Sequence, residues 1–281
     1  LFTGEWNDDF HNAVHVLATG ETHAYYQDFA DEPEKRVARA LAEGFVYQGE
    51  VSRQKGEQRG VDSTGQPPQA FVDFIQNHDQ IGNRAQGERL ISLAGADRTK
   101  VLLAALLLSP HIPLLFMGEE YGETNPFLFF TDFHGDLANA VREGRAKEFA
   151  GHAGHEGEDV PDPNAESTFT LSKLDWAKPG SAEGRAWLDL TKTLLAVRRD
   201  KVVPLLATAG GRSGKVVTTA DGFVAVSWTF PAGTLSMALN IGERTQPLPD
   251  QPGETIFAWP KAGDDLPQHS ILVRFSQGGT Q

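Results

Sequence analysis

The amino-acid sequence predicts an α/β protein in which a parallel sheet with covering helices is followed by a small antiparallel β-domain. In residues 1 to about 135, short apolar runs alternate with helical segments, a pattern typical of a parallel sheet. From about residue 205, strands of period two alternate with Gly or Pro turns. We therefore predict an α/β domain over residues 1–203 and a β-domain over residues 204–281.

The α/β domain is predicted to hold two buried strands with a long helix between them. Phe71–Ile75 is a short aromatic and β-branched run that ends at a polar cluster, as a sheet strand would. Arg89–Leu108 has apolar residues near helical spacing, and Pro110 stops it. Ile112–Met117 is then a second buried strand, closed by a turn at Gly118–Gly122.

The rest of the chain divides into a loop, a helix and a set of strands. Residues 131–182 are rich in Gly, Asp, Glu, His and Pro, which predicts a long loop with a short helix near Asn139–Phe149. Arg185–Lys201 has an apolar side at helical spacing. Asp221-Gly222 is a hairpin turn signal within the β-domain. The predicted strands are Lys215–Thr219, Phe223–Trp228, Leu235–Leu239, Thr255–Phe257 and Ser270–Phe275.

The composition excludes several classes of function. The 281 residues include 25 Lys and Arg and 38 Asp and Glu, and the resulting net charge of −13 argues against nucleic acid and anionic membranes as partners. The absence of cysteine excludes a disulfide framework, a thiolate nucleophile and a Cys-ligated metal. The most apolar stretch, Val101–Gly118, is too short to span a membrane. We expect a soluble globular protein.

The strongest candidate site is the polar run that follows the first predicted strand. Asn77, His78 and Asp79 stand at its carboxyl end, where the active sites of α/β barrels are built. An acidic group there could stabilise developing positive charge, and a neighbouring His could bind a sugar hydroxyl. The alternative is a strand exit in which Asn77 and Asp79 only cap the next helix. The residues alone leave both interpretations open.

Two further clusters could carry chemistry. In the run from Trp6 to His15, Asp8, Asp9, His11 and His15 could bind a metal, or the acidic pair could begin a helix. A Trp beside carboxylates and amides is also typical of sugar sites.

After the second predicted strand, Glu119 and Glu120 could be catalytic, but we favour a structural function for at least one of them. The nearby Phe127–Phe130 is either core or the lining of a subsite.

These motifs resemble those of a known family. Phe74-Ile-Gln-Asn-His-Asp79 is similar to the seventh-strand motif of the α-amylase superfamily of glycoside hydrolases, and Ile112-Pro-Leu-Leu-Phe-Met-Gly-Glu-Glu-Tyr-Gly122 is similar to its eighth-strand segment. Closer details resemble the members that release trehalose, and they lie in Trp6–His11, His78–Arg84 and Phe127–Asp132. The resemblance implies a (β/α)8 TIM barrel, of which this chain holds only the last strands and helices, followed by a small antiparallel β-sandwich domain.

The resemblance also implies a reaction and a set of site residues. The expected reaction is retaining hydrolysis of the α-1,4 glucosidic bond next to the trehalose end of maltooligosyltrehalose, with no cofactor and no metal. Asp79 would be the transition-state stabiliser, and His78 would bind the sugar before the cleaved bond. The remaining residues expected to bind substrate or shape its pocket are Trp6, Asn7, Asp8, Asp9, Phe10, His11, Gln80, Ile81, Gly82, Asn83, Arg84 and Glu119.

The family's nucleophile and general acid follow the fourth and fifth barrel strands, and neither motif is found in this sequence. We therefore expect that Leu1 lies just beyond the fifth strand and that the upstream half of the same protein is a necessary partner. Without it, unpaired strand edges should prevent folding and catalysis. The family also implies a cytoplasmic location. Three alternatives stay open: another superfamily enzyme such as an amylase, branching or debranching enzyme; a non-catalytic carbohydrate-binding fragment; and a metalloenzyme built on His11 and His15.

Overall fold

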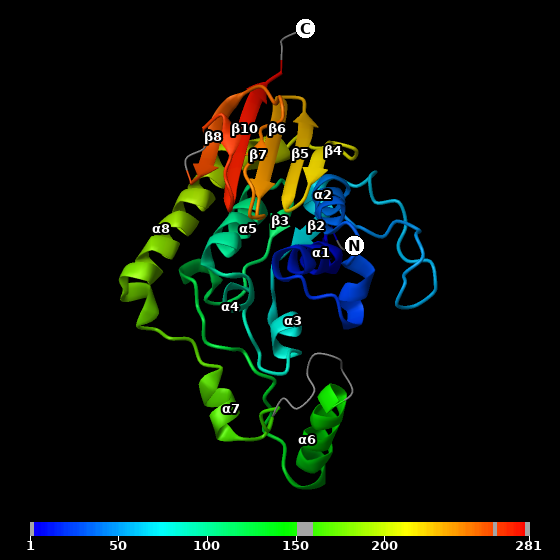
Figure 1. Ribbon diagram of the computed structural model, residues 1–281, viewed down its shortest axis with the longest axis vertical. Helices are drawn as coiled ribbons and strands as arrows, with labels where there is room; N and C mark the ends of the chain where they lie inside the picture. The colour runs from blue at the N-terminus through cyan, green and yellow to red at the C-terminus, as the bar shows by residue number, and fades with distance from the viewer. Residues whose placement is uncertain (1–2, 151–159, 261–262, 279–281) are drawn as a thin grey trace. The chain divides into compact units, whose positions relative to one another are not determined.

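The computed structural model describes residues 3–150, 160–260 and 263–278, and its contacts divide the chain into two compact units (Figure 1). Unit 1 comprises Leu1–Ile75, Ala96–Leu114 and Leu190–Gln281, and unit 2 comprises Gln76–Gly95 and Leu115–Asp189. No helix in the described ranges is long and apolar enough to cross a membrane.

The α-helices are α1 (Asp8–Thr19), α2 (Pro33–Glu43), α3 (His78–Gly82), α4 (Leu90–Ala94), α5 (Ala96–Leu108), α6 (Gly135–Ala150), α7 (Glu166–Leu171), α8 (Ala182–Val197) and α9 (Val203–Leu206). Short 3-10 helices are η1 (Ala24–Phe29), η2 (Pro68–Ala70), η3 (Glu119–Tyr121) and η4 (Lys178–Gly180), and the π-helical turn η5 covers Arg198–Val202. The strands are β1 (Glu5–Trp6), β2 (Phe71–Asp73), β3 (Ile112–Pro113), β4 (Gly214–Ala220), β5 (Phe223–Phe230), β6 (Gly233–Asn240), β7 (Gln246–Pro247), β8 (Glu254–Trp259), β9 (Asp265–Leu266) and β10 (Ser270–Gln277).

Unit 1 contains a short parallel sheet in the order β1-β2-β3. A fully buried carboxylate, Asp73, joins its strands: it accepts hydrogen bonds from Asn7 Nδ2 at 2.8 Å and from His111 Nδ1 at 2.7 Å. Asn7 follows β1 and His111 precedes β3, so one side chain of β2 connects all three strands. A buried carboxylate is tolerated because both of its oxygens are hydrogen-bonded.

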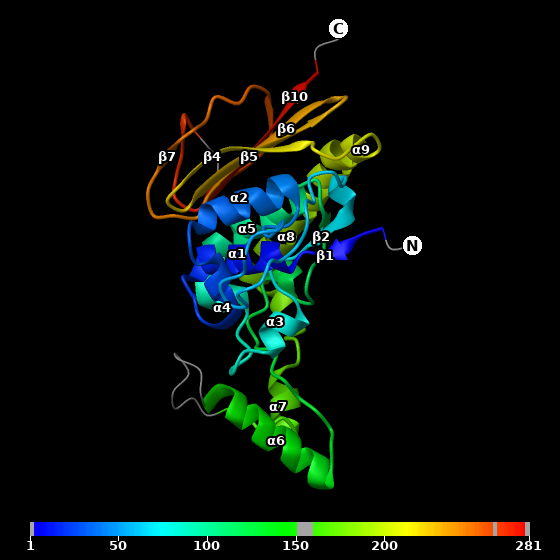
Figure 2. The same cartoon turned by 90° about the vertical axis from the view of Figure 1, so that its right-hand side faces the viewer.

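A five-stranded antiparallel sheet in the order β4-β5-β6-β10-β8 forms the β-domain, and a two-stranded β7-β9 sheet accompanies it. Helices α2 and α5 contact this sheet, as the edge-on view shows (Figure 2). Trp228 of β5 is buried and donates its indole N–H to the carbonyl oxygen of Leu41 in α2 at 3.0 Å. On alternate positions of the same strand, Phe223 and Ala225 pack with Leu266 of β9. The predicted antiparallel β-domain is confirmed, including its five strands and the turn at Gly222, whose φ is +67°.

Within unit 2, arginine side chains hold the backbone of irregular segments. Arg89 is buried and donates from Nε to the carbonyl oxygen of Asn125 at 2.6 Å and from Nη1 to that of Met117 at 2.8 Å. Arg145 of α6 donates to the carbonyl oxygens of Gly82 and Arg84, at 2.8 and 3.2 Å. These bonds provide donors for carbonyl groups at a helix end and in loops.

Four local expectations need correction. The long helix predicted over Arg89–Leu108 is two helices, because Gly95 takes φ +86° and ψ 158° and ends α4. The two predicted strands are shorter than expected: β2 ends at Asp73 and β3 ends at Pro113, although the backbone N–H of Leu114 still donates to the carbonyl oxygen of Asp73 at 2.8 Å. In the predicted long loop, α6 is longer than the helix expected there and α7 is additional, while residues 151–159 lie outside the described residues. The helix predicted to run to Lys201 changes to π geometry after Val197. The domain boundary between residues 203 and 204 stays a prediction.

Candidate functional site

The polar run after β2 folds into the first turn of α3. Asn77 is its N-cap, and the buried Asn77 Oδ1 accepts a hydrogen bond from the backbone N–H of Asp79 at 2.8 Å. The capping interpretation is thus confirmed for Asn77. The side chains of His78 and Asp79 are 57% and 56% exposed, with His78 Nε2 3.3 Å from Asp79 Oδ1. The cap therefore fixes the backbone of Asp79 while its carboxylate stays accessible to a ligand.

The end of α3 is held from several directions. Ile81 and Gly82 are buried, Gln80 is half-buried and Asn83 is exposed. Arg84 is largely covered and pairs with Glu88 at 3.1 Å. Arg145 binds the carbonyl oxygens of Gly82 and Arg84. These contacts give the predicted pocket residues of α3 a defined backbone, whereas their contact with substrate stays a prediction.

Glu119 is buried next to the start of the same run. Its Oε1 accepts from Gln76 Nε2 at 3.3 Å, and its Oε2 accepts from the backbone N–H of Phe116 at 2.9 Å. Burial raises the pKa of Glu119 to about 8, although both hydrogen bonds and the charge of Arg89 oppose the shift. The structural function that we favoured for one glutamate of this turn is confirmed for Glu119. Its predicted contact with substrate stays a prediction.

In unit 1, the run from Trp6 to His11 builds the start of α1. Asn7 is its N-cap: Asn7 Oδ1 accepts from Phe10 N at 3.1 Å, and Asn7 Nδ2 also donates to the carbonyl oxygen of Gly44 at 2.9 Å. Asn7 and Phe10 are buried, while Trp6 is 44% exposed and Asp8 is exposed. The expectation of a helix N-terminus is confirmed here. Only Trp6 and Asp8 of this run present much surface to a ligand.

Asp9 organises the loop that follows α2. Its Oδ2 accepts from the backbone N–H groups of Val46 and Tyr47 at 3.0 and 2.9 Å, and its Oδ1 is ion-paired with Arg59. Burial raises the pKa of Asp9, whereas Arg59 and the two N–H groups oppose the shift. The Arg59 guanidinium also lies 5.0 Å from the centre of the Tyr47 ring.

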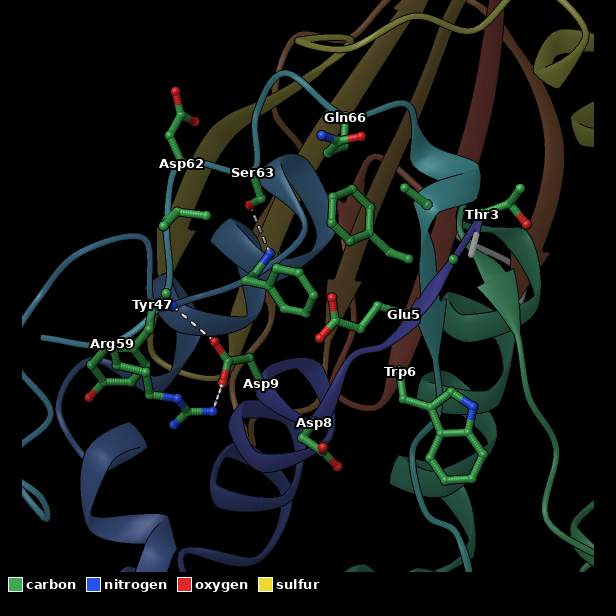
Figure 3. A pocket seen from close by; sticks show the side chains of 16 residues that line it. Thr3, Glu5, Trp6, Asp8, Asp9, Tyr47, Arg59, Asp62, Ser63 and Gln66 are labelled. Atoms are coloured by element: carbon green, nitrogen blue, oxygen red, sulfur yellow. Dashed lines mark hydrogen bonds and ion pairs between the residues drawn. The ribbon is translucent and has the colours of Figure 1, made fainter. Parts of the chain in front are cut away.

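A pocket of about 680 Å³ opens beside this cluster and beside β1 (Figure 3). Its lining combines aromatic and acidic side chains, among them Trp6, Tyr47, Asp8 and Asp62. Flat apolar faces next to carboxylates suit sugar binding, and the contact of these residues with sugar stays a prediction.

The two histidines of α1 are engaged with protein groups. His11 Nδ1–H donates to the carbonyl oxygen of Ile75 at 2.9 Å, and the imidazole stacks on Phe74 with 5.9 Å between ring centres. His15 Nε2 lies 2.7 Å from Glu21 Oε2. No group of three or more His, Asp or Glu side chains suited to a metal ion is found in residues 3–150, 160–260 and 263–278.

Sequence reasoning missed three polar residues that shape these sites: Gln76, Arg89 and Arg59. Gln76 lies within the recognised run but was not singled out. Arg89 directly precedes an apolar helix, and a charged side chain at such a position could have indicated a buried hydrogen-bond partner. Arg59 carries no local signal, because it meets Asp9 across 50 positions of the chain.

Comparison with known proteins places this chain in a family. Residues 211–273 match a domain of unknown function (DUF3459). Malto-oligosyltrehalose trehalohydrolase of Deinococcus radiodurans is 46% identical over 202 residues, which are 71% of this chain and 34% of that protein. The enzymes of the same name from Brevibacterium helvolum and Mycobacterium tuberculosis are 38% identical over 259 residues and 33% identical over 280 residues. The chain belongs to the malto-oligosyltrehalose trehalohydrolase family.

This chain spans between about a third and a half of the length of these trehalohydrolases: 34%, 42% and 47%. A crystal structure from Salmonella typhimurium, of a candidate alpha amylase, matches 99% of this chain with a TM-score of 0.96 and 71% identity, over 47% of its own length. A pullulanase from Anoxybacillus and the alpha-amylase from H. orenii match with TM-scores of 0.51 and 0.50 at 14% identity, and cover 97% and 98% of this chain and 35% and 49% of their own. At that identity the likeness concerns the fold alone, which is shared with the amylase type of glycoside hydrolase.

Proposed function

We propose that the whole protein is a retaining glycoside hydrolase that cleaves the α-1,4 glucosidic bond next to the trehalose end of maltooligosyltrehalose, releasing trehalose and a maltooligosaccharide. The observation that carries this proposal is the 33–46% identity to seven trehalohydrolases, which extends over as many as 280 residues of the chain. The proposal places the reaction in the cytoplasm and requires no metal or cofactor.

In this proposal, β1, β2 and β3 are the sixth, seventh and eighth strands of a (β/α)8 barrel, and the antiparallel domain that follows is a small β-sandwich. The parallel order β1-β2-β3 supports this assignment, as does the position of Asn77-His78-Asp79 after β2. The remaining strands would come from the upstream half of the protein. That half would also supply the nucleophile and the general acid.

Asp79 would act on the charge that develops at the sugar ring. Glycosidic cleavage with retention passes through oxocarbenium-like transition states, which an accessible carboxylate stabilises. The structure supports this function because Asn77 fixes the backbone of Asp79, whereas the Asp79 side chain is half exposed. His78 would donate a hydrogen bond to a sugar hydroxyl.

The other predicted site residues divide into two groups under this proposal. Among the exposed residues, Trp6 and Asp8 would contact sugar in the trehalose-side subsites, and Asn83 would shape the neighbouring pocket together with the half-buried Gln80 and Arg84. The buried residues would shape those subsites through the backbone that they hold, as Asn7 does by capping α1.

The test is the replacement Asp79→Asn in the whole protein, with maltooligosyltrehalose as substrate. Losing one transition-state contact of this kind lowers kcat by about 100-fold or more, with KM changed little. Asp97→Asn is the control, since Asp97 is an exposed partner of Lys100 and should leave kcat unchanged. Unaltered kcat in Asp79→Asn would contradict the assignment. Maltose or glucose in place of trehalose from the unmodified protein would instead indicate a different superfamily activity.

A further inference from the structure

A buried pair of polar side chains, Gln76 and Glu119, lies next to Asn77-His78-Asp79. Both residues are 3% exposed, and Gln76 Nε2 donates to Glu119 Oε1 at 3.3 Å. Burying an amide and a carboxyl group costs free energy unless their hydrogen-bonding groups find partners. Gln76 and Glu119 find such partners in each other and in neighbouring backbone N–H groups.

The Gln76–Glu119 pair connects three segments of unit 2. Gln76 Oε1 accepts from the backbone N–H of Leu90 at 2.9 Å, which is the first residue of α4. Glu119 Oε2 accepts from the backbone N–H of Phe116 at 2.9 Å, in the turn after β3. Both polar atoms of the Gln76 amide, Nε2 and Oε1, are thus hydrogen-bonded.

The neighbouring Arg89 strengthens the same arrangement. It donates to the carbonyl oxygens of Met117 and Asn125, on either side of Glu119. Its guanidinium also lies 5.0 Å from the centre of the Phe116 ring. The turn that carries Glu119 is therefore fixed to the start of α4 independently of Gln76.

We propose that the Gln76–Glu119 pair positions His78 and Asp79 for the reaction, so that Gln76 and Glu119 are positioning residues. The inference rests on the proposed function. Gln76 directly precedes Asn77, whose side chain binds the backbone N–H of Asp79. With Gln76 anchored and Asn77 capping, the backbone between the buried pair and Asp79 is held at both ends. Displacement of a reacting group by about 1 Å costs about 100-fold in rate.

The donors and acceptors of the pair dictate a reciprocal test. In Glu119→Gln, the amide nitrogen cannot accept, so one of the two N–H donors that face residue 119 meets another donor. In Gln76→Glu, two carboxyl groups face each other and hold together only while they share a proton. The double variant Gln76→Glu/Glu119→Gln restores all three hydrogen bonds. The carboxylate at position 76 accepts from the backbone N–H of Leu90 and from the amide nitrogen at position 119, and the amide oxygen at position 119 accepts from the backbone N–H of Phe116.

Kinetics of the whole protein should follow this pattern. We expect kcat of Glu119→Gln to fall by about 10- to 100-fold with KM changed less than about threefold, and kcat of Gln76→Glu to fall as pH rises. In the double variant kcat should return to within about threefold of the unmodified protein. Thr168→Ala is a matched control in unit 2: it removes the hydrogen bond from the buried Thr168, whose Oγ1 donates to the carbonyl oxygen of Asp162, and it should leave kcat unchanged.

Crystal structures of the same three variants provide a readout that does not depend on activity. We expect Asp79 to be displaced in Glu119→Gln and to return to its position in the double variant. The proposal is overturned if Asp79 stays in place in the single variants, or if the double variant is no better than Glu119→Gln. If the unmodified protein does not hydrolyse glucans, the proposed function fails, and the crystallographic comparison still decides whether the pair positions the turn.

Discussion

Replacing the buried Asp73 tests how the parallel sheet is held together. In Asp73→Ala, the N–H groups of Asn7 and His111 that bind its carboxylate lose their acceptor inside the protein. Each buried donor without a partner costs about 1–3 kcal/mol, so we expect the free energy of unfolding to fall by about 2–6 kcal/mol. Asp73 also attracts Arg198, whose pKa burial lowers to about 10. Its loss therefore leaves a buried cation with less compensation.

The assay is urea unfolding of the whole protein followed by tryptophan fluorescence. Asp73→Asn should lower the free energy of unfolding by about half as much as Asp73→Ala. The amide oxygen replaces one of the two carboxylate acceptors, whereas the amide nitrogen faces an N–H donor. Asp97→Ala is the matched control: its side chain is 60% exposed and pairs with Lys100, so its loss should change stability by less than about 0.5 kcal/mol. A loss below about 1 kcal/mol in Asp73→Ala would refute the reasoning, as would an equal loss in Asp97→Ala.

Two further outcomes concern unit 2. The pKa of Glu119 is about 8 in the folded protein against 4.5 as its ordinary value, so the folded state keeps a proton that the unfolded chain releases. Its stabilising contribution is complete below pH 4.5 and is lost as pH rises through 8. Stability should fall with pH by about 1 kcal/mol per pH unit in that window, and urea midpoints should show that Glu119→Gln removes this slope. The same dependence of the urea midpoint on pH in the unmodified protein and in Glu119→Gln would contradict this expectation. Gly122→Ala would place a Cβ 2.7 Å from the buried Trp187 ring at φ +71°, and should lower Tm, with a loss of about 2 kcal/mol or more. Gly144→Ala is its control in calorimetry, because no atom within 4 Å opposes the new methyl group in α6 and Ala favours a helix. Equal Tm values for these two variants would show that the space beside Trp187 is not limiting.

Local signals in the sequence predicted the five long strands of the antiparallel domain. Period-two strands between Gly and Pro turns predicted the five-stranded sheet, because alternation reports one covered face along each strand. The same reasoning failed between Arg89 and Leu108, where the apolar pattern runs through Gly95 although the backbone breaks there. Hydrophobic periodicity reports burial, and it does not report the sign of a glycine φ angle.

The part of the candidate site that lies within one sequence motif could be predicted from the sequence. Asn77, His78 and Asp79 were identified from three adjacent polar residues after an apolar run, and the structure gives Asn77 the capping function that residue type favours. Sequence could not say that Glu119 is buried against Gln76, because 43 positions separate them. Nor could it say that most of the run from Asn7 to His11 faces inward, since acidic and amide residues are usually exposed.

The sequence by itself predicted an α/β segment followed by an antiparallel domain, and the polar run that follows β2, because each depends on residues close together in the chain. Only the tertiary structure decided which polar groups are buried and what they bind. Asp73 meets His111, Asp9 meets Arg59 and Gln76 meets Glu119 across long stretches of chain. A buried polar side chain is stable only with a partner of the right kind at hydrogen-bond distance, and the fold alone supplies that distance.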